Sequence, residues 1–254
     1  MATLEGKRVV VVGGSSGIGF GVAKGSLISQ AELVVIASSS EEKVKNAVSR
    51  LENEVATREL KGKVVGKVVD AGSGDSIKQF AEGLDEVDHL VWTPGSMRGG
   101  FKSFFQNSFK GTNLDEQKDI FDVRFWGAAR AAQLLKFREG GSVVLTGGSA
   151  FSKPIPGVSV GISATGAIDA FTRGLAVDLA PIRVNSVFPG LVDTEFFNEA
   201  PKEIKDHIIA DYSKKLLVKH VADGDEVAEA YLFLMKCSYI TGKRIEVDGG
   251  LLLV

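Results

Sequence analysis

A glycine-rich segment near the start of the chain has the composition of an anion-binding turn. It runs Gly13-Gly-Ser-Ser-Gly17-Ile-Gly19 and directly follows four valines, residues 9–12. A short continuous apolar run is typical of a buried parallel strand, and from Phe20 on the apolar spacing is that of a helix. A strand, a glycine turn and a helix start bring free backbone N–H groups and the positive end of a helix dipole together, where a phosphate can bind. We expect a phosphate site here, although this segment alone also fits an ordinary tight strand–helix turn.

The next apolar run ends in three serines, Ser38, Ser39 and Ser40, and Lys43 follows closely. A dinucleotide site specific for NAD usually ends its second strand in an acid that binds the ribose 2′-hydroxyl. A carboxylate would repel a 2′-phosphate, whereas hydroxyls, backbone N–H groups and a lysine accept it. The serine run therefore favours NADP(H) over NAD. The serines can also cap the helix expected to begin at Glu41, and both roles can hold.

Strands that alternate with helices must position these residues. Apolar runs predict strands at 9–12, 32–37, 63–69, 89–92, 142–146, 183–187 and 244–247, and apolar spacing predicts helices at 20–28, 41–60, 77–84, 114–137, 162–180 and 225–235. The alternation predicts the α/β class: one Rossmann-like, doubly wound parallel sheet of about seven strands with helices on both faces. We expect residues 1–254 to form a single domain, with an amphipathic insertion at about 195–217 that covers the substrate. In such sheets ligands bind at the carboxyl ends of the strands.

Composition excludes several classes of function. The formal net charge is −2 and no basic run occurs, which argues against a nucleic-acid partner. A single cysteine excludes an internal disulfide, and three widely spaced histidines argue against a metal site. No apolar stretch has the length of a signal core or a membrane span, so we expect a soluble cytoplasmic protein.

Four segments form a recognisable series along the chain. Residues 12–19 match the pattern Thr-Gly-x-x-x-Gly-x-Gly with valine in place of threonine, and Asp70 follows the third strand. Residues 189–194 read Pro-Gly-Leu-Val-Asp-Thr, and residues 239–250 read Tyr-Ile-Thr-Gly-Lys-Arg-Ile-Glu-Val-Asp-Gly-Gly. In this order they resemble the short-chain dehydrogenase/reductase family over essentially the full length.

The resemblance implies an NADP(H) site, a small-molecule substrate and a homo-oligomer, a dimer or tetramer built through the helices at 114–137 and 162–180. In the family, the aspartate at the position of Asp70 contacts the adenine, and the Pro-Gly segment passes the nicotinamide. The residues expected to contact the cofactor are Gly13, Ser15, Ser16, Gly17, Ile18, Gly19, Ser38, Ser39, Ser40, Lys43, Asp70, Ala71, Thr93, Pro94, Gly95, Thr146, Pro189, Gly190, Val192 and Thr194.

The family's catalytic tetrad is the part that this chain does not match. In the family a tyrosine donates the proton, a lysine lowers its pKa, a serine holds the substrate oxygen and an asparagine supports a water relay. Alignment on the surrounding motifs places Arg124, Gly148, Gly161 and Thr165 at the asparagine, serine, tyrosine and lysine positions. Without the tyrosine acid, we do not expect ordinary carbonyl reduction by the family mechanism.

Arg124, Asp169 and Ser149 are the candidate catalytic residues. A helix-borne arginine offers a fixed fork for a carboxylate, or stabilises developing negative charge. Asp169 lies one helical turn beyond Thr165 on the same face, so we expect it either to pair with Arg124 or to hold a cationic substrate. A purely structural Arg124–Asp169 ion pair is an equal alternative. Ser149 lies next to the serine position.

Three functions stay open at this point. The first is an NADPH-dependent oxidoreductase of an activated substrate such as an imine or iminium, whose carbon accepts hydride without a tyrosine acid. The replaced tetrad and the Arg-Phe-Trp-Gly motif at 124–127 also resemble fungal reductases of alkaloid assembly that took on a ring-forming cycloaddition. The second is a non-catalytic NADP(H)-binding sensor or scaffold. The third keeps carbonyl reduction with a substitute proton donor such as Thr146, Ser149 or Tyr212.

Overall fold

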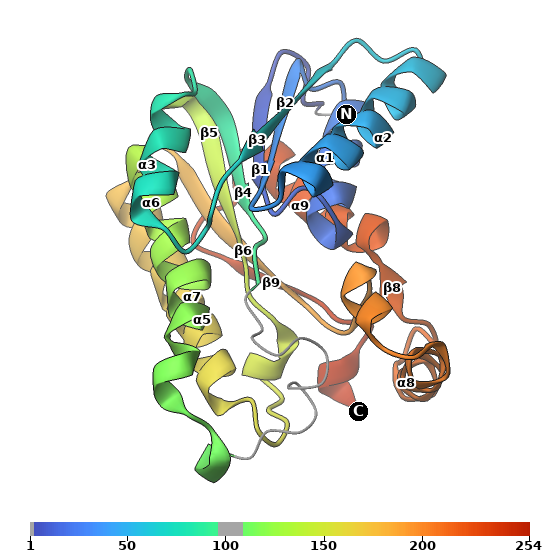
Figure 1. Ribbon diagram of the computed structural model, residues 1–254. Coiled ribbons are helices and arrows are strands. Elements are labelled where there is room, and N and C mark those ends of the chain that lie inside the picture. Colours follow the sequence, from blue (N-terminus) through green and yellow to red (C-terminus); the bar gives the residue numbers. More distant parts are fainter. Residues whose placement is uncertain (1–2, 96–108) are drawn as a thin grey trace.

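The computed structural model describes residues 3–95 and 109–254. Seven parallel strands form one sheet in the order β3-β2-β1-β4-β5-β6-β9 (Figure 1), which confirms the predicted α/β class and the doubly wound sheet. The strands of this sheet are β1 (Arg8–Val12), β2 (Leu33–Ser38), β3 (Lys63–Val68), β4 (Val87–Trp92), β5 (Phe137–Thr146), β6 (Arg183–Pro189) and β9 (Arg244–Val247). Two short strands, β7 (Val192–Asp193) and β8 (Ala222–Asp223), pair separately.

Helices lie on both faces of the sheet. One face carries α1 (Gly17–Ile28), α2 (Glu41–Thr57) and α9 (Gly224–Lys236), and the other carries α3 (Gly74–Glu82), α6 (Gly127–Leu134) and α7 (Ser159–Asp178) (Figure 1). The described part of the chain contains two further α-helices, α5 (Lys118–Phe121) and α8 (Lys202–Lys215). None of the helices in these ranges is both long and apolar enough to cross a membrane.

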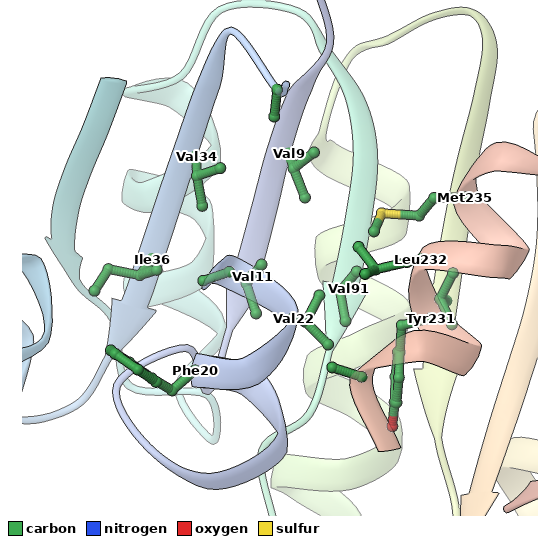
Figure 2. Packing of buried hydrophobic residues seen from close by; sticks show 14 of the residues in the cluster. Val9, Val11, Phe20, Val22, Val34, Ile36, Val91, Tyr231, Leu232 and Met235 are labelled. Atoms are coloured by element: carbon green, nitrogen blue, oxygen red, sulfur yellow. The ribbon is translucent and has the colours of Figure 1, made fainter. Parts of the chain in front are cut away.

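The valines of β1 explain why this strand lies at the centre. Alternate side chains of a strand point to opposite faces, so Val9 and Val11 enter one core and Val10 and Val12 the other. Figure 2 shows Val9 and Val11 packed beside Val22 of α1 and Leu232 of α9. Burial on both faces accounts for the continuous apolar run, which carries no alternation.

The strand order reverses at β1. This strand pairs with β2 on one side and with β4 on the other, both in parallel register. The connections from β1 and β4 therefore leave the sheet in opposite directions and open a crevice at their carboxyl ends. The glycine segment and residues 93–95 both begin there.

The helix predicted at 114–137 differs most from the structure. It is divided into a 3₁₀ turn at Leu114–Gln117, then α5, a π-helical turn at Asp122–Trp126, and α6. It also ends early, because the carbonyl of Lys136 accepts a hydrogen bond of 2.9 Å from the N–H of Val87 and the chain enters the sheet there. Strand β5 consequently starts at Phe137, five residues before the predicted start.

The predicted insertion at 195–217 contains a 3₁₀ turn at Glu195–Glu199 followed by α8. Other predicted helix boundaries differ from the structure by a few residues: α7, for example, begins at Ser159 and ends at Asp178. Residues 96–108, between β4 and the 3₁₀ turn at Phe109–Gly111, lie outside the described residues.

Candidate active site

Two pockets adjoin at the carboxyl ends of the strands. The first, which we call the glycine-loop pocket, has a volume of about 680 Å³ and lies over residues 12–19. The second, the α7 pocket, has a volume of about 320 Å³ and lies over the start of α7. Both volumes fall within the range of small-molecule and cofactor sites. Arg124 is the one described residue that lines both pockets.

The glycine-loop pocket brings together most of the residues predicted to contact a cofactor. Its walls include Gly13, Ser15, Ser16, Gly17, Ile18, Gly19, Ser38, Ser39, Lys43, Asp70, Ala71, Thr93, Pro94, Gly95 and Thr194. Val12, Val69, Val123, Glu195 and Phe196 also line it and were not predicted there. At the end of β2 the described lining residues are Ser38, Ser39 and Lys43, and none of these carries a carboxylate.

Five predicted cofactor contacts lie elsewhere. The hydroxyl of Ser40 accepts a hydrogen bond of 3.3 Å from the N–H of Lys43 and so caps α2. The hydroxyl of Thr146 donates to the carbonyl of Trp92 at 2.7 Å. Val192 is buried in the core. Pro189 and Gly190 line the α7 pocket, on the far side of Arg124 from the glycine loop.

The glycine loop needs glycine at two turning points. Gly13 and Gly17 have φ angles of 83° and 52°, in the left-handed region that side chains disfavour. The N–H of Gly17 opens α1 and donates a hydrogen bond of 2.7 Å to a carboxylate oxygen of Glu195. The N–H groups of Gly13 and Gly14 donate to the carbonyl of Ala37, whereas that of Gly17 already binds an oxyanion. This is the donor chemistry that a phosphate requires.

Arg124 is carried by the π-helical turn. Its Nη2 lies close above Gly95, where an added Cβ would approach it to 2.9 Å. Its Nε is buried and has no hydrogen-bond partner among the described residues. Burial lowers the pKa of Arg124, but an arginine keeps its charge at neutral pH. The site thus holds a partly desolvated positive charge between the two pockets.

The other three positions aligned with the family's tetrad, Gly148, Gly161 and Thr165, line the α7 pocket with Arg124. A Cβ at Gly148 or Gly161 would meet nothing within 4 Å, so this wall has open space. Ser149 is buried and also lines this pocket, as does Tyr212 of α8. The sequence alignment therefore placed all four positions around one cavity.

The expected ion pair between Arg124 and Asp169 is wrong. The carboxylate of Asp169 pairs with Arg173 at 2.7 Å and with Arg244 at 3.4 Å. Asp169 is buried and is not among the described residues that line either pocket. The sequence did contain an indication of the pairing with Arg173. This residue lies four positions after Asp169 on the same helix, and i,i+4 side chains lie next to each other.

Comparison with known proteins assigns the chain to a family. A family model described as enoyl-(acyl carrier protein) reductase matches residues 12–252. The short-chain dehydrogenase/reductase ucsE of Acremonium sp. is 32% identical over 262 aligned positions, which cover 98% of this chain and 97% of that protein. The chain belongs to the short-chain dehydrogenase/reductase family.

Two solved structures resemble this short-chain dehydrogenase/reductase. The MalC reductase/Diels-Alderase of Malbranchea aurantiaca superposes with a TM-score of 0.89 at 28% identity, over 99% of this chain and 98% of that one. A small-chain dehydrogenase in complex with NADPH superposes with a TM-score of 0.77 at 30% identity, over 98% and 100% of the two chains.

Proposed function

We propose that this short-chain dehydrogenase/reductase is an NADP(H)-dependent reductase that acts on an activated substrate without a tyrosine acid. The observation that carries the proposal is the place of Arg124, which lines both pockets. A cofactor on one side and a substrate on the other would meet at its guanidinium. The oxidoreductase class itself follows from the family.

The glycine-loop pocket is the place for NADP(H). The N–H groups of the loop suit the pyrophosphate, and Ser38, Ser39 and Lys43 suit a 2′-phosphate because no carboxylate lies among them. A related structure is a complex with NADPH. When bound, the cofactor supplies a hydride.

Among the described residues that line the α7 pocket, a glycine, Gly161, stands at the position of the family's tyrosine acid. We assign Gly161 and Thr165 to the positions of the family's tyrosine and lysine, and Gly148 to that of its serine. The hydroxyl of Thr146 is held between the carbonyl of Trp92, at 2.7 Å, and the hydroxyl of Tyr231, at 2.8 Å, which removes it as a substitute donor. Ser149 and Tyr212 remain as hydroxyl groups in the wall.

Arg124 favours a substrate on which negative charge develops. Hydride addition to the β-carbon of a conjugated carbonyl leaves an enolate, whose oxygen a guanidinium stabilises by charge and by two parallel N–H donors. Water can then protonate the enolate carbon. The family model that matches the chain is described as an enoyl reductase, which agrees with this reaction class.

An imine or iminium is the other activated electrophile that needs no tyrosine. Its positive charge would require a nearby carboxylate, and Asp169 is already paired with two arginines. The geometry therefore supports the conjugated carbonyl better.

A combined reductase and cyclase is the second candidate function. The likeness to the MalC reductase/Diels-Alderase favours it, as does the space that Gly148 and Gly161 leave beside Arg124. Such a reaction needs room for a folded substrate and a group that polarises it, and both are present here.

The test is NADPH oxidation with a cyclic enone, the saturated ketone of the same ring and a cyclic imine. We expect turnover of the enone and none of the saturated ketone. Arg124→Gln should lower kcat by about 10²- to 10³-fold, and Arg124→Lys should retain part of it. Tight NADPH binding without turnover of any of the three compounds would favour the non-catalytic sensor or scaffold instead.

A further inference from the structure

The charged side chains that line the α7 pocket, among the described residues, are Arg124 and Lys153. Arg124 lies at the inner end, and Lys153 lies at the exposed rim, where its ammonium donates to the backbone oxygens of Leu251 and Val254. Among the described residues that line the pocket, none is an aspartate or a glutamate. Residues 96–108, outside the described part, contain no acidic residue in the sequence, so they cannot add one.

Asp119 and Asp122 lie close to Arg124 along the chain but are not among the described residues that line the pocket. Two further acidic residues near these walls, Asp169 and Asp248, are engaged elsewhere. Asp169 follows Thr165 on α7, but its carboxylate is held by Arg173 and Arg244. Asp248 precedes the C-terminal wall, and its two oxygens accept hydrogen bonds from the N–H groups of Gly250 and Leu252, at 2.9 and 3.0 Å. The carboxylates of Asp169 and Asp248 therefore do not balance the positive charges of Arg124 and Lys153.

The rest of the wall is mainly apolar. Ile120, Ile155, Val158, Ile162, Leu191 and Leu251 contribute aliphatic side chains. Ile120 belongs to α5, Ile162 to α7 and Leu251 to the C-terminal 3₁₀ turn. Such a wall binds the hydrocarbon body of a ligand, because burial removes apolar surface from water.

The guanidinium of Arg124 has one nitrogen without a hydrogen-bond partner among the described residues. Its buried Nε has no acceptor among the described residues, and a buried donor without an acceptor is costly. A carboxylate or an enolate offers oxygen acceptors with the geometry of the arginine fork. A cation at the same place would lose its hydration and gain no counter-charge.

We infer that the α7 pocket selects apolar organic anions, and that Arg124 is the residue that determines this selectivity, with Lys153 adding to it at the rim. The inference rests on the proposed function only in taking this pocket as the substrate side. It goes further because it names the charge of the substrate.

Cinnamate, cinnamamide and cinnamylammonium test this selectivity, since they share one hydrocarbon body and differ in charge. Each is titrated by calorimetry into the full-length protein saturated with NADP⁺. We expect cinnamate to bind about ten- to a hundredfold more tightly than cinnamamide, the range that one hydrogen-bonded charge contributes, and cinnamylammonium to bind most weakly. Equal binding of the three, tighter binding of the cation, or no binding of cinnamate at millimolar concentration would overturn the inference.

Variants assign the effect to residues. Arg124→Gln should abolish the preference for the acid, and Lys153→Gln, at an exposed site, should reduce it several-fold. Lys78→Gln removes a positive charge from α3, whose residues line neither pocket among those described, and should leave the preference unchanged. A preference that survives both Arg124→Gln and Lys153→Gln would contradict the assignment.

The two proposals can fail separately. A preference for cinnamate without turnover of the enone supports the anion selectivity and counts against the reductase. Turnover of the enone with no preference among the three cinnamyl compounds supports the reductase and counts against the anion selectivity.

Discussion

The carboxylate of Glu195 binds the N–H of Gly17 at 2.7 Å, across 178 residues of sequence. This N–H opens α1 in the glycine loop, where a phosphate of the cofactor would bind. Arg50 lies 3.8 Å from the other oxygen of the same carboxylate. A side chain from the turn that precedes α8 thus occupies a donor of the expected cofactor site.

Glu195→Gln should therefore raise the affinity for NADPH. The substitution removes a negative charge from the place that the phosphates must enter, and we expect the Kd to fall about three- to tenfold at low salt. Fluorescence titration of the nucleotide measures it. Glu203→Gln, in the first turn of α8, is the matched control and should change little. An unchanged or higher Kd in Glu195→Gln would contradict the competition.

Ser38 and Ser40 should separate into two roles. Ser38 lines the glycine-loop pocket, so Ser38→Asp should weaken NADPH at least about tenfold through repulsion of the 2′-phosphate, and should spare NADH. Ser40 caps α2, so Ser40→Ala should lower the free energy of unfolding by about 1 kcal/mol and leave the nucleotide affinity unchanged. Calorimetry and urea unfolding measure the two effects. If Ser38→Asp binds both nucleotides as the parent does, the 2′-phosphate does not lie at Ser38.

On our assignment of positions 148, 161 and 165 to the family's serine, tyrosine and lysine, introducing those three residues should add ketone reduction. Gly148 and Gly161 have open space around an added Cβ, so Gly148→Ser, Gly161→Tyr and Thr165→Lys can be combined without moving the backbone at the two glycines. A positioned acid contributes about 10²- to 10⁴-fold, and we expect at least a tenfold gain on the saturated cyclic ketone. The control carries Gly161→Phe instead of Gly161→Tyr. Equal activity of the tyrosine and phenylalanine variants would refute the assignment of position 161.

Stability should depend on pH through His89. This residue is buried in β4 with Nδ1 2.9 Å from the hydroxyl of Ser142, and burial lowers the pKa of His89 from 6.5 to about 4. Since the unfolded chain takes up the proton first as the pH falls, stability that is complete above about pH 6.5 is lost progressively toward pH 4. Between pH 7 and pH 5 this one group should cost about 2 kcal/mol in the free energy of unfolding. Urea unfolding of His89→Gln should show a pH dependence smaller by that amount, and an equal dependence in both proteins would contradict it.

The sheet could be predicted from the sequence because each central strand has a recognisable sequence pattern of its own. Continuous apolar runs such as 9–12 occur where both faces are buried, and the structure buries all four valines. The boundary between α6 and β5 could not be predicted in this way. It depends on the contact of Lys136 with Val87, far away in sequence, and the π-helical turn that carries Arg124 has no simple sequence pattern.

The glycine-loop pocket was largely predictable, because its donors follow consecutive strand ends. Its long-range members were not. Glu195 reaches Gly17 only after the whole sheet has formed, and Asp169 takes Arg244 as a partner from 75 residues away. Helical spacing placed Asp169 on the same helix face as Thr165, but it could not show which basic side chain would pair with the Asp169 carboxylate.

The dissociation constants of NADPH, NADP⁺, NADH and NAD⁺ test the central claim most directly. Calorimetric titration of the purified protein with each nucleotide gives all four values. We expect NADPH and NADP⁺ to bind at least about tenfold more tightly than NADH and NAD⁺, because one phosphate distinguishes the pairs. Binding of none of the four would contradict the account, since a reductase of this family without its cofactor has no hydride to transfer.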